Sequence, residues 1–207
     1  VPMMNVVNGG AHADNTIDYQ EFMIVPGGFP TFRESLRAGA EVFAALKGLL
    51  KAKKKSTNVG DEGGFAPALR DEVEVLDLLD EAVVKAGYRP GDDVAFALDV
   101  AASELWGNGH YGFIKSNRTS VPPEGMVARY DALSQNYPIV SIEDGMGEED
   151  WKGWTALTRT LGARIQIVGD DVFVTNPEIF KKGIEAGVAN SILIKLNQIG
   201  TVTETLD

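Results

Sequence analysis

Carboxylates stand directly after three short apolar segments of this sequence, and a lysine ends a fourth. The acidic residues are Asp99, Glu143 with Asp144, and Asp170 with Asp171, and the lysine is Lys195. In a chain with no cysteine and only two histidines, carboxylates that converge on one point form an oxygen-only ligand set for a hard cation, Mg²⁺ before Mn²⁺ or Ca²⁺. A lysine beside such an ion could act as a general base, because burial and a nearby cation lower its pKa.

Each of these residues also has a purely structural interpretation. A carboxylate after a strand is often a helix N-cap or a loop residue. A lysine in an apolar segment is often paired with a carboxylate, because burying an unpaired charge is costly. Three carboxylates followed by a lysine on the next segment favour the functional interpretation. Because adjacent strand residues point to opposite sides, we expect only one of Asp170 and Asp171 to face the site.

Two glycine-rich segments carry further candidates. Residues 60–65 (GDEGGF) lie between two predicted helices, and the glycines indicate close backbone approach or positive φ around acidic groups. The alternative is an acidic surface turn. Residues 8–12 (NGGAH) follow a predicted strand and end in His12. Of the two histidines, His12 is the better candidate for a site, since His110 lies in a sequence typical of a surface turn.

The elements that must position these residues alternate between strand and helix. We expect strands at residues 3–7, 21–25, 94–98, 139–142, 165–168 and 191–196, helices at 31–55, 71–86, 122–136, 150–161 and 176–186, and a loop at 106–118. After two strands and two helices, the alternation is typical of parallel strands with crossover helices. About six strands are predicted where a closed (β/α)8 barrel has eight, so the fold class is α/β, an incomplete TIM barrel. The candidate residues stand at the carboxyl ends of the strands, where barrel sites lie.

Composition excludes several classes of function. The 207 residues include 19 Lys and Arg against 30 Asp and Glu, and the net charge of −11 disfavours binding to nucleic acid or to an anionic membrane surface. No apolar segment approaches the roughly 20 residues of a membrane span. The absence of cysteine excludes disulfides and fits a reducing compartment. We therefore expect a cytoplasmic protein with no nucleic-acid or membrane partner.

Seven segments together resemble the enolase family, the phosphopyruvate hydratases of glycolysis. They are VPMMNVVNGGAH (1–12), QEFMI (20–24), VGDEGGFAP (59–67), LDVAASE (98–104), SIEDG (141–145), VGDD (168–171) and IKLNQIG (194–200). The resemblance runs over the whole chain and is weakest at residues 107–125. It implies that residues 1–207 are part of an enolase C-terminal catalytic domain, an enolase-type TIM barrel with a ββαα start and then βα repeats, and with about six of its eight strands.

The resemblance implies a role for each of eight residues. Asp99, Glu143 and Asp170 would be ligands of Mg²⁺. Lys195 would remove the C2 proton of 2-phosphoglycerate, and Glu62 would help expel the C3 hydroxyl as water. His12, Gln20 and Glu21 would line the substrate site, with Glu21 near Glu62. A Lys base with one or two Mg²⁺ ions is known from the enolase superfamily. The implied enzyme is a Mg²⁺-dependent lyase that makes phosphoenolpyruvate, and a homo-oligomer, dimer or higher, in its full-length form.

Enolases have further parts that these 207 residues lack. A separate N-terminal domain brings a serine to a second Mg²⁺, and a Ser-His-Arg-Ser-Gly stretch and a further lysine hold the substrate. We therefore expect that Val1 begins inside a longer gene product and that the 207 residues alone are inactive or nearly so. The alternatives are another enolase-superfamily enzyme, such as a racemase or cycloisomerase, which residues 60–65 argue against, a non-catalytic enolase-like binding module, or a Mg²⁺-binding barrel of unknown substrate.

Overall fold

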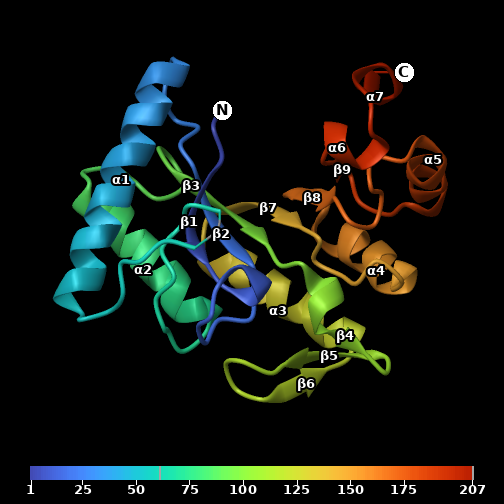
Figure 1. Ribbon diagram of the computed structural model, residues 1–207, viewed down its shortest axis with the longest axis horizontal. Helices are drawn as coiled ribbons and strands as arrows, with labels where there is room; N and C mark the ends of the chain where they lie inside the picture. Colours follow the sequence, from blue (N-terminus) through green and yellow to red (C-terminus); the bar gives the residue numbers. More distant parts are fainter. Residues whose placement is uncertain (61, 207) are drawn as a thin grey trace.

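The chain forms an open sheet of six strands with helices packed against it (Figure 1). The computed structural model describes residues 1–60 and 62–206. The strands are β1 (Met4–Asn8), β2 (Glu21–Val25), β3 (Ala95–Asp99), β7 (Ile139–Glu143), β8 (Gln166–Gly169) and β9 (Ser191–Ile192), in the order β1-β2-β3-β7-β8-β9. The pairs β1–β2 and β2–β3 are antiparallel, and the remaining pairs are parallel. The predicted fold class, with two leading strands and then strand–helix repeats, is confirmed.

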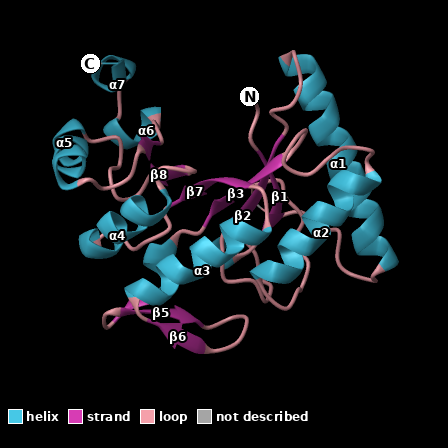
Figure 2. Cartoon of the chain, turned by 180° about the vertical axis from the view of Figure 1, so that it is seen from behind, coloured by secondary structure: helices cyan, strands magenta, loops and turns pink. Residues whose placement is uncertain are grey.

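Helices lie between the strands along the chain, except for the last two, which follow β9. They are α1 (Phe32–Ala52), α2 (Glu72–Lys85), α3 (Pro123–Asn136), α4 (Trp151–Leu161), α5 (Pro177–Ala186), α6 (Leu196–Ile199) and α7 (Val202–Leu206). Seen from behind, α2, α3 and α4 lie across the same face of the sheet (Figure 2). The starts of α1 and α2 follow from their caps, since Thr31 accepts a hydrogen bond from the Glu34 N–H and Asp71 accepts one from the Glu74 N–H. Within the described residues, no helix combines the length and the apolarity needed to cross a bilayer.

The core lies between the sheet and these helices. Strand β3 is buried at all five positions, as expected for a strand covered on both faces. Leu46 of α1, Leu79 of α2 and Trp154 of α4 are fully buried and belong to the same hydrophobic cluster as Phe96 and Leu98 of β3. Each such side chain contributes about 1.5–3 kcal/mol by leaving water. This packing fixes the strand ends, and with them the residues that follow.

Residues 106–118, predicted to be a loop, form most of a second sheet instead. Strands β4 (Trp106–Gly107), β5 (His110–Phe113) and β6 (Thr119–Val121) make a three-stranded antiparallel sheet. Asn108 and Gly109 have φ values of 53° and 79°, the positive angles that a two-residue type I′ turn requires. Alternate residues Tyr111 and Phe113 are buried in the core. That alternation and the Asn-Gly pair are hairpin signals, so the loop prediction was wrong.

The last predicted strand, residues 191–196, is also shorter than expected. Ser191 and Ile192 pair with β8, and the Leu193 N–H donates to the Gly169 carbonyl at 3.0 Å. The chain then leaves the sheet, because Lys195 is the N-cap of α6. Lys195 therefore lies three residues beyond the strand, and its side chain is 43% exposed rather than buried in an apolar segment.

Candidate active site

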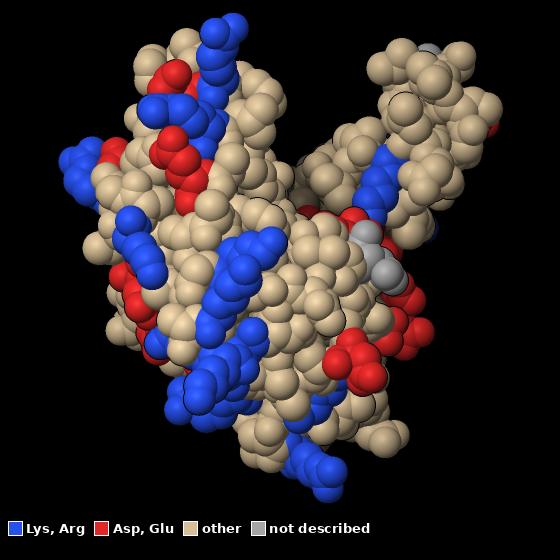
Figure 3. All heavy atoms as spheres, turned by 60° about the vertical axis from the view of Figure 1, so that its left-hand side comes forward, with Lys and Arg blue, Asp and Glu red and all other residues tan. Residues whose placement is uncertain are grey.

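One cavity of about 490 Å³ opens at the carboxyl ends of the parallel strands, and the eight residues selected from the sequence all line it. They are His12, Gln20, Glu21, Glu62, Asp99, Glu143, Asp170 and Lys195. The cavity also contacts Ala101, Asp144, Asp171 and Leu193. In the space-filling view, acidic and basic side chains meet at the floor of the hollow between the two upper lobes (Figure 3).

The sheet register explains why acidic side chains meet there. Glu21 of β2 pairs with Asp99 of β3, and Asp99 pairs with Glu143 of β7. Directly paired residues project from the same face, and neighbouring strands are about 4.8 Å apart. Three carboxylates from three strands therefore stand side by side, and we call Glu21, Asp99 and Glu143 the carboxylate row. Val168 of β8 pairs with Glu143, so Asp170 follows just beyond the end of the row.

Burial and mutual repulsion raise the pKa values of the row. Burial, and then the Asp99 charge, raises the pKa of Glu143 to about 9. Burial, and then the Glu21 charge, raises the pKa of Asp99 to about 7, although the Gln20 amide and the Ala101 N–H each donate to it at 3.0 Å. In the described part of the chain, no donor bonds to the Glu143 carboxylate. Crowded oxygen donors of one charge fit a hard cation such as Mg²⁺.

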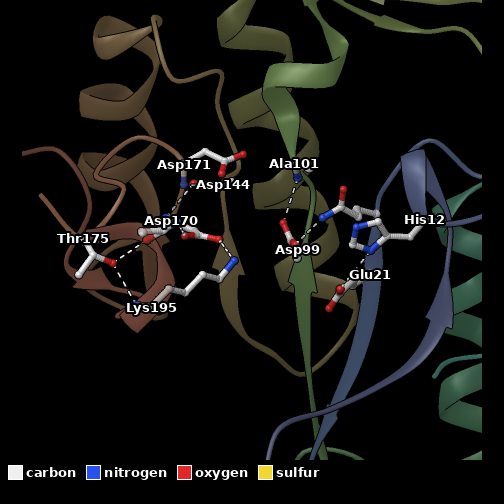
Figure 4. A network of polar contacts seen from close by, with 11 residues as sticks. His12, Glu21, Asp99, Ala101, Asp144, Asp170, Asp171, Thr175 and Lys195 are labelled. Atoms are coloured by element: carbon white, nitrogen blue, oxygen red, sulfur yellow. Dashed lines mark hydrogen bonds and ion pairs between the residues drawn. The ribbon is translucent and has the colours of Figure 1, made fainter. Parts of the chain in front are cut away.

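The second group of acidic residues is hydrogen-bonded within itself (Figure 4). We call Asp144, Asp170, Asp171 and Lys195 the β8–β9 wall. Both oxygens of Asp144 accept backbone bonds, from the Asp170 N–H at 3.0 Å and the Asp171 N–H at 2.8 Å. Both oxygens of Asp170 are also occupied, by the Lys195 ammonium group and by the Gln198 amide at 2.7 Å. Burial is the main cause that raises the pKa of Asp144 to about 7.

Asp170 and Asp171 both line the cavity, contrary to the expectation that only one would face it. Strand β8 ends at Gly169, so the alternation of side chains along a strand no longer applies to the next two residues. The Asp170 carbonyl accepts from the N–H groups of Phe173 and Val174, and this turn brings both carboxylates to the same side. Asp170 is buried, whereas Asp171 is exposed.

The pKa of Lys195 depends on the acidic residues around it. Burial lowers its pKa, but the carboxylates of Asp170 and, to a smaller extent, Glu143 outweigh burial and raise the pKa above its usual value. The expected lowering includes the effect of a nearby cation and stays a prediction. In this structure the Lys195 ammonium group is paired with the Asp170 carboxylate, as in the structural alternative. The backbone N–H of Lys195 donates to the Thr175 hydroxyl at 3.0 Å, which fixes the start of α6 against the turn after β8.

The opposite side of the cavity carries His12, Glu21 and Glu62, which we call the β1–β2 wall. His12 Nδ1 lies 3.4 Å from Glu21 Oε1, and ligand atoms of all three residues lie within 4.8 Å of one another. The turn that bears Glu62 approaches closely because Gly60 has no side chain. A Cβ there would lie 2.4 Å from Asn8 Nδ2 and 2.9 Å from the His12 carbonyl oxygen. The close approach predicted for residues 60–65 is confirmed, and Asp61 lies outside the described residues.

The predicted ligands Asp99, Glu143 and Asp170 surround the cavity but are not gathered at one point. Among residues 1–60 and 62–206, two groups of acidic or histidine side chains have ligand atoms within 4.8 Å of one another. One is the β1–β2 wall, the other is Asp144 with Asp170 and Asp171, and neither contains Asp99 or Glu143. The pairing of Asp170 with Lys195 and Gln198 holds it on its own side.

Sequence reasoning gave several site residues no role. Asp144 and Asp171 were noted among the carboxylates after strand ends, but neither was chosen for the site. Gln198 and Thr175 carry no signal in the sequence, because they reach Asp170 and Lys195 only through the turns after β8 and β9. The positive φ of Asp144, 42°, which lets its carboxylate face two backbone N–H groups, also has no signature in the sequence.

The fold and the cavity together define an α/β barrel-type protein with its polar site at the carboxyl ends of the parallel strands. The family model described as "Enolase, C-terminal TIM barrel domain" matches residues 1–207. The chain therefore belongs to this family, and its open sheet of six strands is an incomplete barrel of the enolase type.

Proposed function

We propose that this chain supplies the catalytic barrel of an enolase that converts 2-phosphoglycerate to phosphoenolpyruvate with Mg²⁺. One observation carries the proposal most directly. Lys195 and Glu62, a candidate base and a candidate acid, line one cavity together with the buried carboxylates of Asp99 and Glu143. A dehydration of this kind removes a proton and a hydroxyl from neighbouring carbons, so it needs a base and an acid in reach of one substrate.

Asp99, Glu143 and Asp170 would hold the metal ion, because they offer the carboxylate oxygens that Mg²⁺ prefers. The ion, when bound, supplies positive charge next to the negative charge that develops on the substrate. The raised pKa values of Asp99 and Glu143 support this assignment, since crowded buried carboxylates lack a compensating charge. The Gln20 amide and the Ala101 N–H orient Asp99 toward the cavity.

The chain's own residues would carry out the proton transfers. Neutral Lys195 Nζ accepts the C2 proton, and the electron pair of that bond forms the C2–C3 double bond. Glu62 donates a proton to the C3 hydroxyl, which leaves as water as the C3–O bond breaks. Lys195 must first lose a proton to act as the base. The ion pair with Asp170 stabilises the charged ammonium form, so Asp170 also controls how readily Lys195 becomes neutral. His12, Gln20 and Glu21 line the cavity and would orient the substrate.

The proposal is tested with the polypeptide in which this chain is naturally made, by Mg²⁺-dependent formation of phosphoenolpyruvate. Lys195→Ala and Glu62→Gln should each reduce kcat by about 10²–10⁴-fold. Lys181→Ala, at an exposed position on α5, is the matched lysine control and should retain activity. Absence of turnover in the parent protein, or unchanged rates in both variants, would refute the proposal.

Exchange of the C2 proton with deuterated solvent separates the two roles. Lys195→Ala should abolish exchange, because the base makes and breaks the C2–H bond. Glu62→Gln should retain exchange while it loses water elimination. Loss of exchange in both variants, with Mg²⁺ still bound, would mean that the base and acid assignments are wrong. Turnover of a substrate that is racemised instead would favour another activity of the enolase superfamily.

A further inference from the structure

Asparagine followed by glycine is the sequence pair in which a side-chain amide is lost most readily. The backbone nitrogen of the second residue attacks the side-chain carbonyl carbon of the asparagine, and glycine hinders this attack least because it has no Cβ. The chain contains the pair twice, at residues 8–9 and at residues 108–109. The two pairs lie in opposite surroundings, so we expect a different chemical fate for each.

The first pair is held on every side. The Asn8 side chain is fully buried, its Nδ2 donates to the Gly64 carbonyl at 2.8 Å, and its Oδ1 accepts from the Asn5 amide. The Gly9 N–H donates to the Gln20 carbonyl at 2.8 Å. The attacking nitrogen and the amide carbon therefore cannot approach each other until these three hydrogen bonds break.

The second pair is the exposed two-residue turn between β4 and β5. Within the described residues, no hydrogen bond reaches the Asn108 side chain or the Gly109 N–H. A Cβ built on Gly107 or Gly109 would meet nothing within 4 Å. Figure 2 shows β5 at the periphery of the molecule, beyond α3. Solvent therefore reaches the amide directly, and no neighbouring side chain opposes a rotation of the turn.

The turn can also open without disturbing the main sheet. Strand β4 is two residues long, and in the described chain two residue pairs hold it to β5. The outer pair is formed by Gly107 and His110, which are both exposed. Short elements with few buried contacts open locally far more often than the core does. Asn108 can therefore leave its φ of 53° and reach the geometry that the attack requires while the rest of the chain stays folded.

We propose that Asn108 deamidates spontaneously and becomes an isoaspartyl residue, whereas Asn8 keeps its amide. The Gly109 nitrogen loses its hydrogen and bonds to the Asn108 Cγ, the bond from Cγ to the amide nitrogen breaks, and that nitrogen leaves as ammonia. Water then opens the succinimide ring at either of its two carbonyls, which gives aspartate or isoaspartate. In the isoaspartate the backbone runs through Cβ, so the turn gains one backbone atom and a negative charge.

The modified turn lies apart from the candidate active site. No residue of the small sheet, all of which the structure describes, lines the cavity. Deamidation should therefore leave turnover unchanged, and the inference does not rest on the proposed function. The product is instead a substrate for a protein methyltransferase that acts on isoaspartyl carboxylates, because the residue lies in an exposed turn that such an enzyme can reach.

Incubation at physiological temperature in mildly alkaline buffer, followed by peptide mapping with mass spectrometry, tests the site. The sample is the polypeptide in which this chain is naturally made. We expect Asn108 to exchange its amide for an acid at least about tenfold faster than Asn8, because the three hydrogen bonds of the first pair must open before it reacts. Transfer of a labelled methyl group from S-adenosylmethionine by an isoaspartyl methyltransferase identifies the isoaspartate.

Two controls make the result decisive. Asn108→Gly is the matched variant, since a Gly-Gly pair suits the same type of turn, and it should abolish methylation of the folded protein. Unfolding in urea should let Asn8 and Asn108 react at similar rates, because the sequence pair is the same and the contacts of the first pair are lost. The proposal is overturned if Asn108 keeps its amide in the folded protein while the unfolded chain loses it. Equal rates at the two positions in the folded protein, or unchanged methylation of Asn108→Gly, would also overturn it.

The outcome is independent of the dehydration assay. An intact Asn108 amide in a protein with Lys195-dependent turnover removes this site and leaves the proposed function standing. Deamidation at Asn108 in a protein that has no turnover even when fresh removes the proposed function and leaves the site.

Discussion

The two walls of the cavity both carry carboxylates, but they differ in how those carboxylates are satisfied. In the β8–β9 wall, Asp144 and Asp170 accept hydrogen bonds on all four of their oxygens. In the β1–β2 wall, Glu62 is exposed and the Nδ1 atom of His12 has no hydrogen bond within the described residues. Among the described residues, the carboxylates of the β8–β9 wall are thus satisfied by several internal hydrogen bonds, whereas the β1–β2 wall is held by the single pair of His12 and Glu21.

Topology accounts for the difference. Parallel strands end in turns whose first N–H groups are free, and the N–H groups of Asp170 and Asp171 bond to Asp144 on the neighbouring strand. Antiparallel β1 and β2 are joined by a long loop, and its position is set by segments distant in sequence, such as Lys115 and Gly60. The first wall follows from the sheet itself, and the second depends on packing between loops.

Asp99 and Glu143, the two residues of the carboxylate row that belong to neither wall, should give the largest effect, through their titration. The pKa values of Asp99 and Glu143, about 7 and about 9, lie above their unfolded values, so the folded chain holds these protons more tightly. Their contribution to stability is present below about pH 4 and is lost as pH rises through 7 to 9. We expect the unfolding free energy of the metal-free chain to fall by about 2–4 kcal/mol between about pH 5 and pH 9.

Urea unfolding across this pH range, with chelator and then with excess Mg²⁺, provides the measurement. Mg²⁺ should restore most of the loss at the high-pH end, because it binds the ionised carboxylates. A metal-free chain that becomes more stable as pH rises would contradict the electrostatic account of the row.

Substitution of Gly60 should displace the turn that bears Glu62 and so disrupt the β1–β2 wall, without affecting the β8–β9 wall. The added Cβ of Gly60→Ala would meet Asn8 and the His12 carbonyl at less than 3.0 Å, and we expect a loss of about 1–3 kcal/mol from overpacking. Gly107→Ala is the control, since a Cβ there has nothing within 4 Å. Equal stability of the two variants in thermal unfolding would mean that the turn bearing Glu62 can shift freely.

Removal of Asp144 should break the β8–β9 wall. Asp144→Ala leaves the N–H groups of Asp170 and Asp171 without their acceptor, at a cost of about 2 kcal/mol. Asp171→Ala, at an exposed carboxylate of the same wall, should change stability by less than about 0.5 kcal/mol. Denaturant midpoints of the two variants provide the comparison, and a larger effect at Asp171 would reverse our assignment of the supporting residue.

The smallest effect is expected at the loop that carries His12. Lys115→Met removes two hydrogen bonds to the Gly10 and Ala13 carbonyls and should cost about 1 kcal/mol. Amide hydrogen exchange should accelerate in residues 10–15 and remain unchanged in the turn after β8. Arg118→Met, on the same connecting turn but exposed, is the control. Exchange that is equally slow in both variants would show that other contacts hold the loop.

The sequence was sufficient to predict the six strands of the main sheet and the carboxylates that follow them, because both depend on where apolar segments end. Asp99 and Glu143 come at those ends, and the register aligns them. The sequence was insufficient to predict the raised pKa of Lys195. That pKa depends on the carboxylate of Asp170, 25 positions away, and the sequence does not indicate which way that carboxylate faces. The orientation of Asp171 and the two hydrogen bonds from Lys115 to the loop that carries His12 were missed for the same reason. Turn geometry and loop packing are set by contacts between residues that are distant in sequence.

The small sheet of β4, β5 and β6 is fixed at one end and free at the other. Its turn at Lys115 and Ser116 is anchored, because both N–H groups donate to the buried carboxylate of Asp18 at 2.9 Å. Its turn at Asn108 and Gly109 is exposed, and nothing lies within 4 Å of a Cβ built on Gly109. A peptide tag or a fluorescent reporter can therefore be inserted at the turn of Asn108 and Gly109 with the site undisturbed. The same insertion at the turn of Lys115 and Ser116 would displace the loop that carries His12.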